Sequence, residues 1–175
     1  NVDKLLVVDA DTIIHPNAPD FFKFCDNNVC GVHDDGDYDW ILRSIENYGK
    51  FFSSTINWEQ YINSGFFIVD AKLKYLFDSM QELYFANKDE LIELQKLGVG
   101  TDQTPFNYML HRNKIDLKIL PYKYNMSCMP KKEIMGDDML FTKLGYMYHF
   151  NGLPGNKEEV VPYWMKKTYE YLYEN

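Results

Sequence analysis

The chain contains 175 residues, of which 46% are hydrophobic and 25% charged, a composition that permits a full core and excludes intrinsic disorder as the default state. Its 26 acidic and 18 basic residues give a formal net charge of −8, which argues against nonspecific nucleic-acid binding, because that binding needs a basic face. No apolar run approaches the roughly 18 residues of a membrane span, so we predict none.

Strand-like and helix-like patterns alternate along the chain. They predict strands at 5–8, 29–32, 65–69 and 115–120, and helices from Pro19, at 38–48, at 72–97 with a break near Asn87, from Thr101 and at 158–173. The run at 5–8 is short, continuous and apolar, which is typical of a central parallel strand covered on both faces. We therefore predict a single α/β domain over residues 1–175.

The three cysteines are Cys25, Cys30 and Cys128, an odd number without a CxxC motif. This pattern predicts buried free thiols and indicates neither a disulfide framework nor a zinc site. No signal peptide is visible, and reduced cysteines favour a cytoplasmic location, provided that no segment is missing before Asn1. The compartment is otherwise open.

Two carboxylates, Asp9 and Asp11, end the first predicted strand. Residues i and i+2 of a strand point to the same side, and the carboxyl edge of an open α/β sheet is where ligands bind. Two like charges this close favour a bound divalent cation or a raised pKa in one carboxyl group. The alternative is a pair of solvated strand-end carboxylates, with Asp11 capping a turn.

Several further motifs follow in a fixed order. They are Asn63-Ser64-Gly65 running into a strand, Thr101-Asp102-Gln103 at a helix start, Leu120-Pro121 followed by Tyr124-Asn125, and His149-Phe150-Asn151-Gly152. With Asp9-Ala10-Asp11, this ordered set resembles the GT-A glycosyltransferases, especially family 8, the glycogenin-like and galactosyltransferase-like retaining enzymes. The resemblance extends from about residue 5 to residue 164. It implies a Rossmann-like GT-A fold and transfer of a hexose from a nucleotide sugar to an acceptor.

The resemblance also implies a donor site with a metal ion. Asp9, Asp11 and His149 would hold Mn²⁺ (or Mg²⁺) on the diphosphate of a UDP-sugar, UDP being the nucleotide that the family uses. Ala10 and Gly152 would contact the nucleotide, since a glycine lets the backbone approach the diphosphate. Lys157 is the candidate phosphate clamp, although the family's lysine lies six residues after the histidine and Lys157 lies eight after His149. A plain surface lysine is the alternative.

The sugar side of the site is implied in the same way. The resemblance implies that Asp34, Asn63, Ser64, Asp102 and Gln103 bind the sugar, and that Gln103 and Asp102 are the catalytic residues. An amide near the anomeric carbon suits a retaining reaction in which a leaving-phosphate oxygen acts as the base. Three alternatives stay open: Asp102 as a helix N-cap, Asn63 as a turn residue, and Asp34 as part of a solvated acidic loop in which Asp35 or Asp37 could take its place.

The acceptor is a glycan, a protein or a lipid, and the oligomeric state is open. Among the many aromatic residues, Tyr122, Tyr124 and Trp164 could stack on an acceptor sugar, although packing in the core is the more frequent role of such rings.

Two other functions compete with the transferase. Strand-DxD also opens the haloacid-dehalogenase-like phosphatases, where Asp9 would be the nucleophile, Asp11 the acid/base and Gly136-Asp137-Asp138 the late acidic motif. The third hypothesis is a partial, non-catalytic domain that binds a nucleotide sugar or a glycan. Only eight residues precede Asp9, whereas a GT-A domain normally places three strand–helix units before its DxD strand. We therefore expect the metal- and sugar-binding half of such a domain, without its nucleotide-binding strands.

Overall fold

The computed structural model describes residues 2–26 and 28–174. Its strands are β1 (Lys4–Val8), β2 (Thr12–Ile14), β3 (Val29–His33), β4 (Ile62–Asp70), β5 (Leu117–Leu120) and β6 (Met147–His149). Its α-helices are α1 (Tyr38–Phe52), α2 (Lys74–Ala86), α3 (Lys88–Lys96), α4 (Gln103–Arg112) and α5 (Lys157–Tyr173). Short 3₁₀ helices are η1 (Phe21–Phe24), η2 (Trp58–Gln60), η3 (Ala71–Leu73), η4 (Tyr122–Tyr124) and η5 (Leu140–Lys143).

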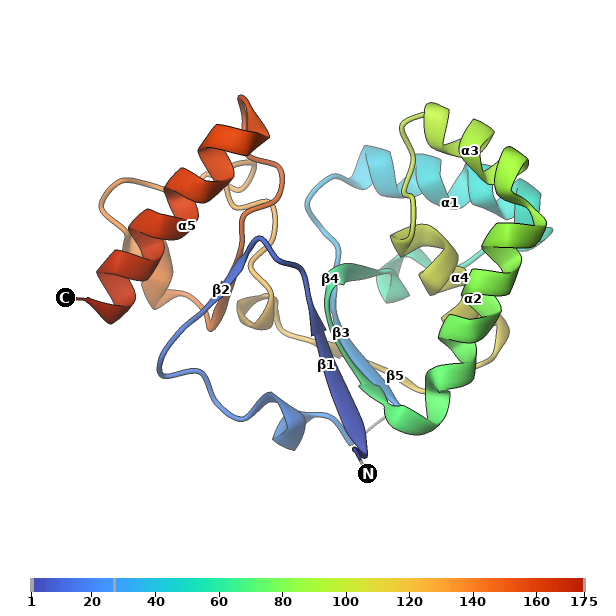
Figure 1. Ribbon diagram of the computed structural model, residues 1–175, viewed down its shortest axis with the longest axis horizontal. Helices are drawn as coiled ribbons and strands as arrows, with labels where there is room; N and C mark the ends of the chain where they lie inside the picture. Colours follow the sequence, from blue (N-terminus) through green and yellow to red (C-terminus); the bar gives the residue numbers. More distant parts are fainter. Residues whose placement is uncertain (1, 27, 175) are drawn as a thin grey trace.

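One mixed sheet in the order β1-β4-β3-β5 forms the centre of the fold (Figure 1), and β2 and β6 form a separate two-stranded ribbon. Strand β4 is antiparallel to both β1 and β3, whereas β3 and β5 are parallel. Strands β1, β3 and β5 therefore run in the same direction, and their carboxyl ends meet the beginning of β4 at one edge. At that edge, Val8 is opposite Phe66 and His33 is opposite Ile62.

Both faces of the sheet are covered, as the alternation along β4 shows. Phe66 and Ile68 pack with Cys30, Leu120 and other residues on one face. Phe67 and Val69, which point the opposite way, pack against apolar residues of η3, α2 and α4. Helices α1 to α4 lie on one side of the sheet in Figure 1, and α5 lies on the other.

Most of the predicted elements are confirmed. The predicted strands at 29–32, 65–69 and 115–120 correspond to β3, β4 and β5, and the helix at 158–173 corresponds to α5. The expected break near Asn87 separates α2 from α3. Helix α1 begins where Asp37 accepts a capping hydrogen bond from Trp40 N. Among the described residues, no helix has the length and apolar character needed to cross a membrane.

The prediction for residues 5–8 is wrong in two respects. β1 lies at the edge of the sheet and pairs antiparallel with β4, instead of lying in the centre among parallel neighbours. Leu5 and Val8 are 49% and 38% exposed, so the strand is not covered on both faces throughout. A short apolar run reports only that its side chains favour burial; its partner and direction depend on the long-range pairing with β4.

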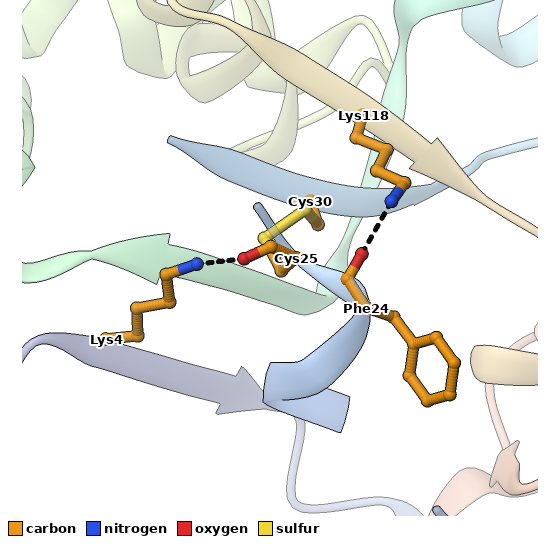
Figure 2. Close-up of a disulfide and its surroundings, with 5 residues drawn as sticks. All are labelled: Lys4, Phe24, Cys25, Cys30 and Lys118. Atoms are coloured by element: carbon orange, nitrogen blue, oxygen red, sulfur yellow. Dashed lines mark hydrogen bonds between the residues drawn. A yellow bond between two sulfur atoms is a disulfide. The ribbon is translucent and has the colours of Figure 1, made fainter. Parts of the chain in front are cut away.

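The prediction of three free thiols is also wrong. Cys25 and Cys30 form a disulfide between the end of η1 and the beginning of β3 (Figure 2). Cys128 is free. The turn of η1 brings the two Cα atoms to 5.7 Å, a separation that the spacing in sequence does not reveal. The disulfide also removes the argument from reduced cysteines for a cytoplasmic location.

Two lysines fix the same segment from neighbouring strands. Figure 2 shows Lys4 of β1 donating to the carbonyl of Cys25, and Lys118 of β5 donating to the carbonyl of Phe24, at 2.8 Å. The end of η1 is therefore held by one covalent and two polar contacts at the sheet edge opposite to the carboxyl ends of β1, β3 and β5.

The disulfide yields a stability prediction. Because it closes a loop with a sequence separation of five, reduction should lower the free energy of unfolding by about 2 kcal/mol through loop entropy. For a chain of this size, the melting temperature should fall by roughly 4–8 °C. Thermal denaturation with and without a thiol reductant, followed by circular dichroism, measures the shift.

The double variant Cys25→Ser/Cys30→Ser is the matched control, since it should melt near the reduced protein and ignore the reductant. Equal melting temperatures for the oxidised and reduced protein would contradict the prediction.

Candidate active site

Asp9, Asp11 and His149 form a compact group beyond the carboxyl end of β1. Asp9 follows β1, and its backbone N–H donates to the carbonyl of Gly65 at 3.1 Å. Asp11 directly precedes β2, which pairs antiparallel with β6 so that Thr12 is opposite His149. The N–H of Phe150 donates to the carbonyl of Asp11 at 2.9 Å, which continues this pairing. A strand pair from opposite ends of the chain thus places the imidazole beside both carboxylates.

The side chains of this group lie within direct contact. Nε2 of His149 is 3.2 Å from Oδ1 of Asp11 and 3.4 Å from Oδ2 of Asp9. The imidazole is buried, with His149 only 2% exposed, whereas Asp9 is open to solvent and Asp11 is partly covered. The imidazole therefore forms the buried floor of the group, and the two carboxylates form its solvent-facing side, called the mouth below.

The charges of the three side chains are coupled. Burial acts to lower the pKa of His149, but hydrogen bonding and attraction to Asp11 and Asp9 outweigh it and raise this pKa to about 9. The contact with His149 lowers the pKa of Asp11 against the opposing effect of burial. The charge of Lys157 acts in the same direction on Asp11. Without a cation, a protonated imidazole offsets one of the two carboxylate charges and leaves the group with a net charge of about −1.

The donor set fits a divalent cation. One ligand atom from each of Asp9, Asp11 and His149 can be chosen so that all lie within 4.8 Å of one another. Two carboxylates and one imidazole suit Mn²⁺ better than a site made only of oxygen atoms would, and three protein ligands leave positions for a diphosphate. Nδ1 of His149 is buried and has no hydrogen-bond partner among the described residues, so the ring is oriented by the contacts of Nε2 together with packing.

Gly65 provides that packing. A Cβ atom at this position would lie 2.3 Å from Cε1 of His149 and 2.8 Å from Oδ2 of Asp9, distances that no real contact shows. The absence of a side chain at Gly65 thus lets the imidazole and the Asp9 carboxylate approach β4. The sequence contained the signal, the glycine of Asn63-Ser64-Gly65, but the motif alone did not reveal this contact.

A second, buried polar cluster begins at Asp34, directly after β3. Its Oδ2 accepts from Nε2 of Gln103 at 2.7 Å and from Nδ2 of Asn63 at 3.2 Å. Oε1 of Gln103 accepts from the backbone N–H of Ser64 at 2.9 Å and lies 3.3 Å from the Ser64 hydroxyl. Asp34, Asn63 and Gln103 are all buried. The structure therefore brings together four of the five residues predicted for the sugar side.

Of the three aspartates in the acidic loop, only Asp34 belongs to this cluster. Asp35 pairs with Lys132 at 2.9 Å, and Asp37 pairs with Lys131 at 2.6 Å. Those two lie outside the cluster, whereas Asp34 is bonded within it. The alternative of a solvated loop therefore does not hold for Asp34.

The two groups are contiguous. Oδ1 of Asn63 accepts from the N–H of Gly65 at 3.0 Å, a local contact within β4 that links Asn63 to the glycine beside the metal-ligand group. The same oxygen accepts from Nδ2 of Asn125 at 2.9 Å. The next residue, Met126, accepts from the N–H of His149 at 3.2 Å. In the sequence, Asn125 stands only as the end of the motif Tyr124-Asn125, which does not reveal this contact with Asn63.

Asp102 lies apart from this cluster. It is exposed at the N-cap position of α4 but makes no capping hydrogen bond, and instead accepts from the hydroxyl of Thr101 at 3.0 Å. It lines a pocket of about 280 Å³ with residues of α2 and α3. Among the described residues, no hydrogen bond joins Asp102 to Asp34, Asn63 or Ser64.

Of the three residues predicted to contact the nucleotide, Ala10 and Lys157 lie near the metal-ligand group, and Gly152 lies beside Cys128. Ala10 is exposed between the two carboxylates. Lys157 is the exposed first residue of α5, and its positive charge helps to lower the pKa of Asp11. Gly152 adopts a left-handed φ of +67°, and a Cβ there would lie 3.5 Å from Sγ of Cys128. Burial raises the pKa of the Cys128 thiol to about 11, so it stays protonated.

The remaining candidates have structural surroundings. Tyr124 is buried against Phe21, and the hydroxyl of Tyr122 donates to the carbonyl of Ser127 at 2.7 Å. Trp164 is partly buried against an apolar cluster that includes Met139, Phe141 and Phe150. All three rings therefore contribute to packing. Of the acidic pair expected for a phosphatase, Asp137 pairs with Lys167 and Asp138 accepts from the N–H of Leu140.

Comparison with known proteins supports a glycosyltransferase-like fold. No protein-family description matches the sequence, and no curated protein matches it. Among solved structures, the apo structure of the bifunctional glycosyltransferase WbbM is similar over 95% of this chain, with a TM-score of 0.52 and 18% sequence identity. The chain spans about a third of WbbM, 32% of its length. At this identity the similarity shows the fold alone.

Gly65 gives a prediction for the metal-ligand group. Gly65→Ala should push His149 and Asp9 away from β4 and weaken Mn²⁺ binding by about tenfold or more, the range seen when ligand positioning is disturbed. Electron paramagnetic resonance of free Mn²⁺ measures the affinity. Gly136→Ala is the control, because its Cβ would meet only a movable Asp138 oxygen at 3.3 Å. Unchanged affinity in Gly65→Ala would contradict the packing argument.

The ion pairs of His149 give a prediction for stability in the absence of metal. Because the pKa of His149 rises from 6.5 to about 9 on folding, its pairing stabilises the fold fully below about pH 6.5. This contribution is lost as the pH rises through about 9. Urea denaturation in EDTA should therefore show a larger loss of stability between pH 6.5 and 9.5 for the wild type than for His149→Gln. Parallel pH profiles in the two proteins would refute the coupling.

Proposed function

We propose that this chain acts as a metal-dependent glycosyltransferase of the GT-A type, similar to family 8, that moves a hexose from a UDP-sugar to an acceptor with retention. The observation that carries the proposal is the contiguity of two groups at one sheet edge. Asp9, Asp11 and His149 offer ligands for a divalent cation, and Asp34, Asn63 and Gln103 offer buried polar atoms for a sugar. The similarity to a glycosyltransferase fold supports this combination.

The metal-ligand group would bind the diphosphate end of the donor. A divalent cation held there supplies positive charge that stabilises the leaving diphosphate. Lys157, whose charge already reaches Asp11, would add a second positive charge at the mouth of the site. The left-handed turn at Gly152 would let backbone approach the phosphates closely.

The buried cluster would orient the hexose. Asp34 accepts from Gln103 and Asn63 through one oxygen, and its other oxygen lies 3.3 Å from the N–H of Gly36, leaving lone pairs for sugar hydroxyls. Ser64 and Asp34 fix both ends of the Gln103 amide. A fixed, neutral amide is suited to positioning rather than to nucleophilic attack, which fits a retaining reaction in which a leaving-phosphate oxygen takes the acceptor proton. Asp102 would contact the sugar from outside the cluster.

The direct test is calorimetric titration with UDP, with and without Mn²⁺. We expect binding only with the metal, and a loss of about tenfold or more in Asp11→Asn, which keeps the shape but removes a charged ligand. Asp78→Asn is the matched control, because Asp78 pairs with Lys74 on the surface of α2, away from the site.

Turnover separates the competing functions. Release of hexose from a UDP-sugar that is lost in Asp34→Asn supports the transferase. Hydrolysis of an aryl phosphate that is lost in Asp9→Asn would indicate the phosphatase instead. Metal-dependent UDP binding without any turnover would leave a non-catalytic binding domain. Metal-independent UDP binding, or none, would refute the proposed site.

A further inference from the structure

Two exposed aromatic rings lie beside the buried polar cluster. Tyr38 is the first residue of α1 and is 51% exposed, and Trp58 is the first residue of η2 and is 40% exposed. Their ring centroids are 5.6 Å apart with the planes at 87°, so the rings meet nearly at a right angle. The Trp58 ring also contacts the ring of His33, with the two centroids 5.5 Å apart. Large apolar surface is thus exposed at a corner built by three aromatic side chains.

The corner is held in place by its local structure. Nε2 of His33 lies 2.9 Å from the carbonyl oxygen of Trp58, which fixes the beginning of η2 against the end of β3. Asn57 caps η2 by accepting from the N–H of Glu59. Asp37 caps α1 and is itself paired with Lys131. Both rings therefore project from capped helix starts, and a ligand need not order them first.

Backbone hydrogen bonds link the aromatic corner to the buried polar cluster. Tyr61 donates its backbone N–H to the carbonyl of Trp58 at 3.0 Å, and its carbonyl accepts from the N–H of Asp34 at 3.0 Å. His33 immediately precedes Asp34 in the chain. Two backbone hydrogen bonds thus separate Trp58 from the carboxylate that Gln103 and Asn63 contact. The exposed rings of Tyr84 and Phe85 on α2 also meet each other, but within residues 2–26 and 28–174 no hydrogen bond joins that pair to Asp34, Asn63 or Gln103.

The charges around the rings select among ligands. Asp39 lies in the first turn of α1 beside Tyr38, and Glu59 lies in η2 beside Trp58. Their carboxylates can accept hydrogen bonds from hydroxyl groups, and the Asn57 amide can donate or accept them. The two carboxylates repel an anionic ligand, and the nearby Lys131 is paired with Asp37. A neutral pyranose matches this surface, because its C–H face is apolar and its rim carries hydroxyls.

We propose that Tyr38 and Trp58 form an acceptor subsite that stacks a neutral pyranose of a glycan acceptor beside the donor sugar. This inference rests on the proposed function, since a transferase needs an acceptor next to its donor. It assigns the acceptor to the glycans and distinguishes neutral from acidic sugars. It also moves the stacking role away from Tyr122, Tyr124 and Trp164, which are engaged in packing.

The test begins with the wild-type chain on an array of neutral, uronate-containing and sialylated oligosaccharides, after which the strongest neutral binder is titrated by calorimetry. We expect neutral glycans to be retained, and Trp58→Ala and Tyr38→Ala each to weaken the titrated binding by about fivefold or more. Trp58→Phe should retain most of it. Phe85→Ala, which removes a ring that is 67% exposed, is the control and should bind as the wild type does.

Three results would overturn the subsite. They are the absence of any neutral glycan binding, equal affinity in Trp58→Ala and the wild type, and a preference for acidic glycans. Self-association that Trp58→Ala abolishes, seen by analytical ultracentrifugation, would also overturn it and assign the rings to an interface between copies. Circular dichroism melts of each variant ensure that a loss of binding is not a loss of fold.

The same variants keep this failure distinct from that of the proposed function. Mn²⁺-dependent UDP binding should be unchanged in Trp58→Ala, because neither ring contacts the metal-ligand group. Glycan binding that depends on Trp58, without any UDP binding, would retain the subsite and reject the donor site. UDP binding without glycan binding would reject the subsite alone.

Discussion

The direction of β4 is the constraint on which the candidate site depends. Because β4 runs antiparallel to β1 and β3, its first residues lie at the edge where those strands end. Asn63, Ser64 and Gly65 therefore meet residues from three other parts of the chain. Asn63 bonds to Asp34, Ser64 bonds to Gln103, and Gly65 makes room for His149. A parallel β4 would carry this tripeptide to the far edge and separate the two groups.

Electrostatics then links the fold to the proposed chemistry. His149 is buried, and burial alone would favour its neutral form, yet two neighbouring carboxylates raise its pKa to about 9. The carboxylates that hold a proton on the imidazole can also hold a divalent cation, which neutralises both Asp9 and Asp11, whereas the imidazolium offsets only one of the two charges. The buried polar cluster differs from this group. Its neutral amides do not offset the charge of Asp34, but they fix the orientation of its carboxylate by hydrogen bonds.

The sequence allowed prediction of most elements and of the residues that gather at the edge. Local periodicity located β3, β4, β5 and α5, and the doublet Asp9 and Asp11 indicated a ligand site. Long-range relations were not accessible in the same way. The edge position of β1 and the disulfide of Cys25 and Cys30 depend on which segments meet, which periodicity does not encode. The contacts of Asn125 and Gly65 were missed for the same reason.

By itself, the sequence determined the residue types available for chemistry: two carboxylates at a strand end, amides at a helix start and a histidine late in the chain. Only the tertiary structure decided which of them act together. Asp34 joins the cluster while Asp35 and Asp37 pair with lysines, and Asp102 stays outside it although its neighbour Gln103 is inside. Tyr38 and Trp58 remain exposed where Tyr124 is buried. Hydrogen-bond distance and burial belong to three-dimensional packing, so side chains of one type acquire different roles only after the chain folds.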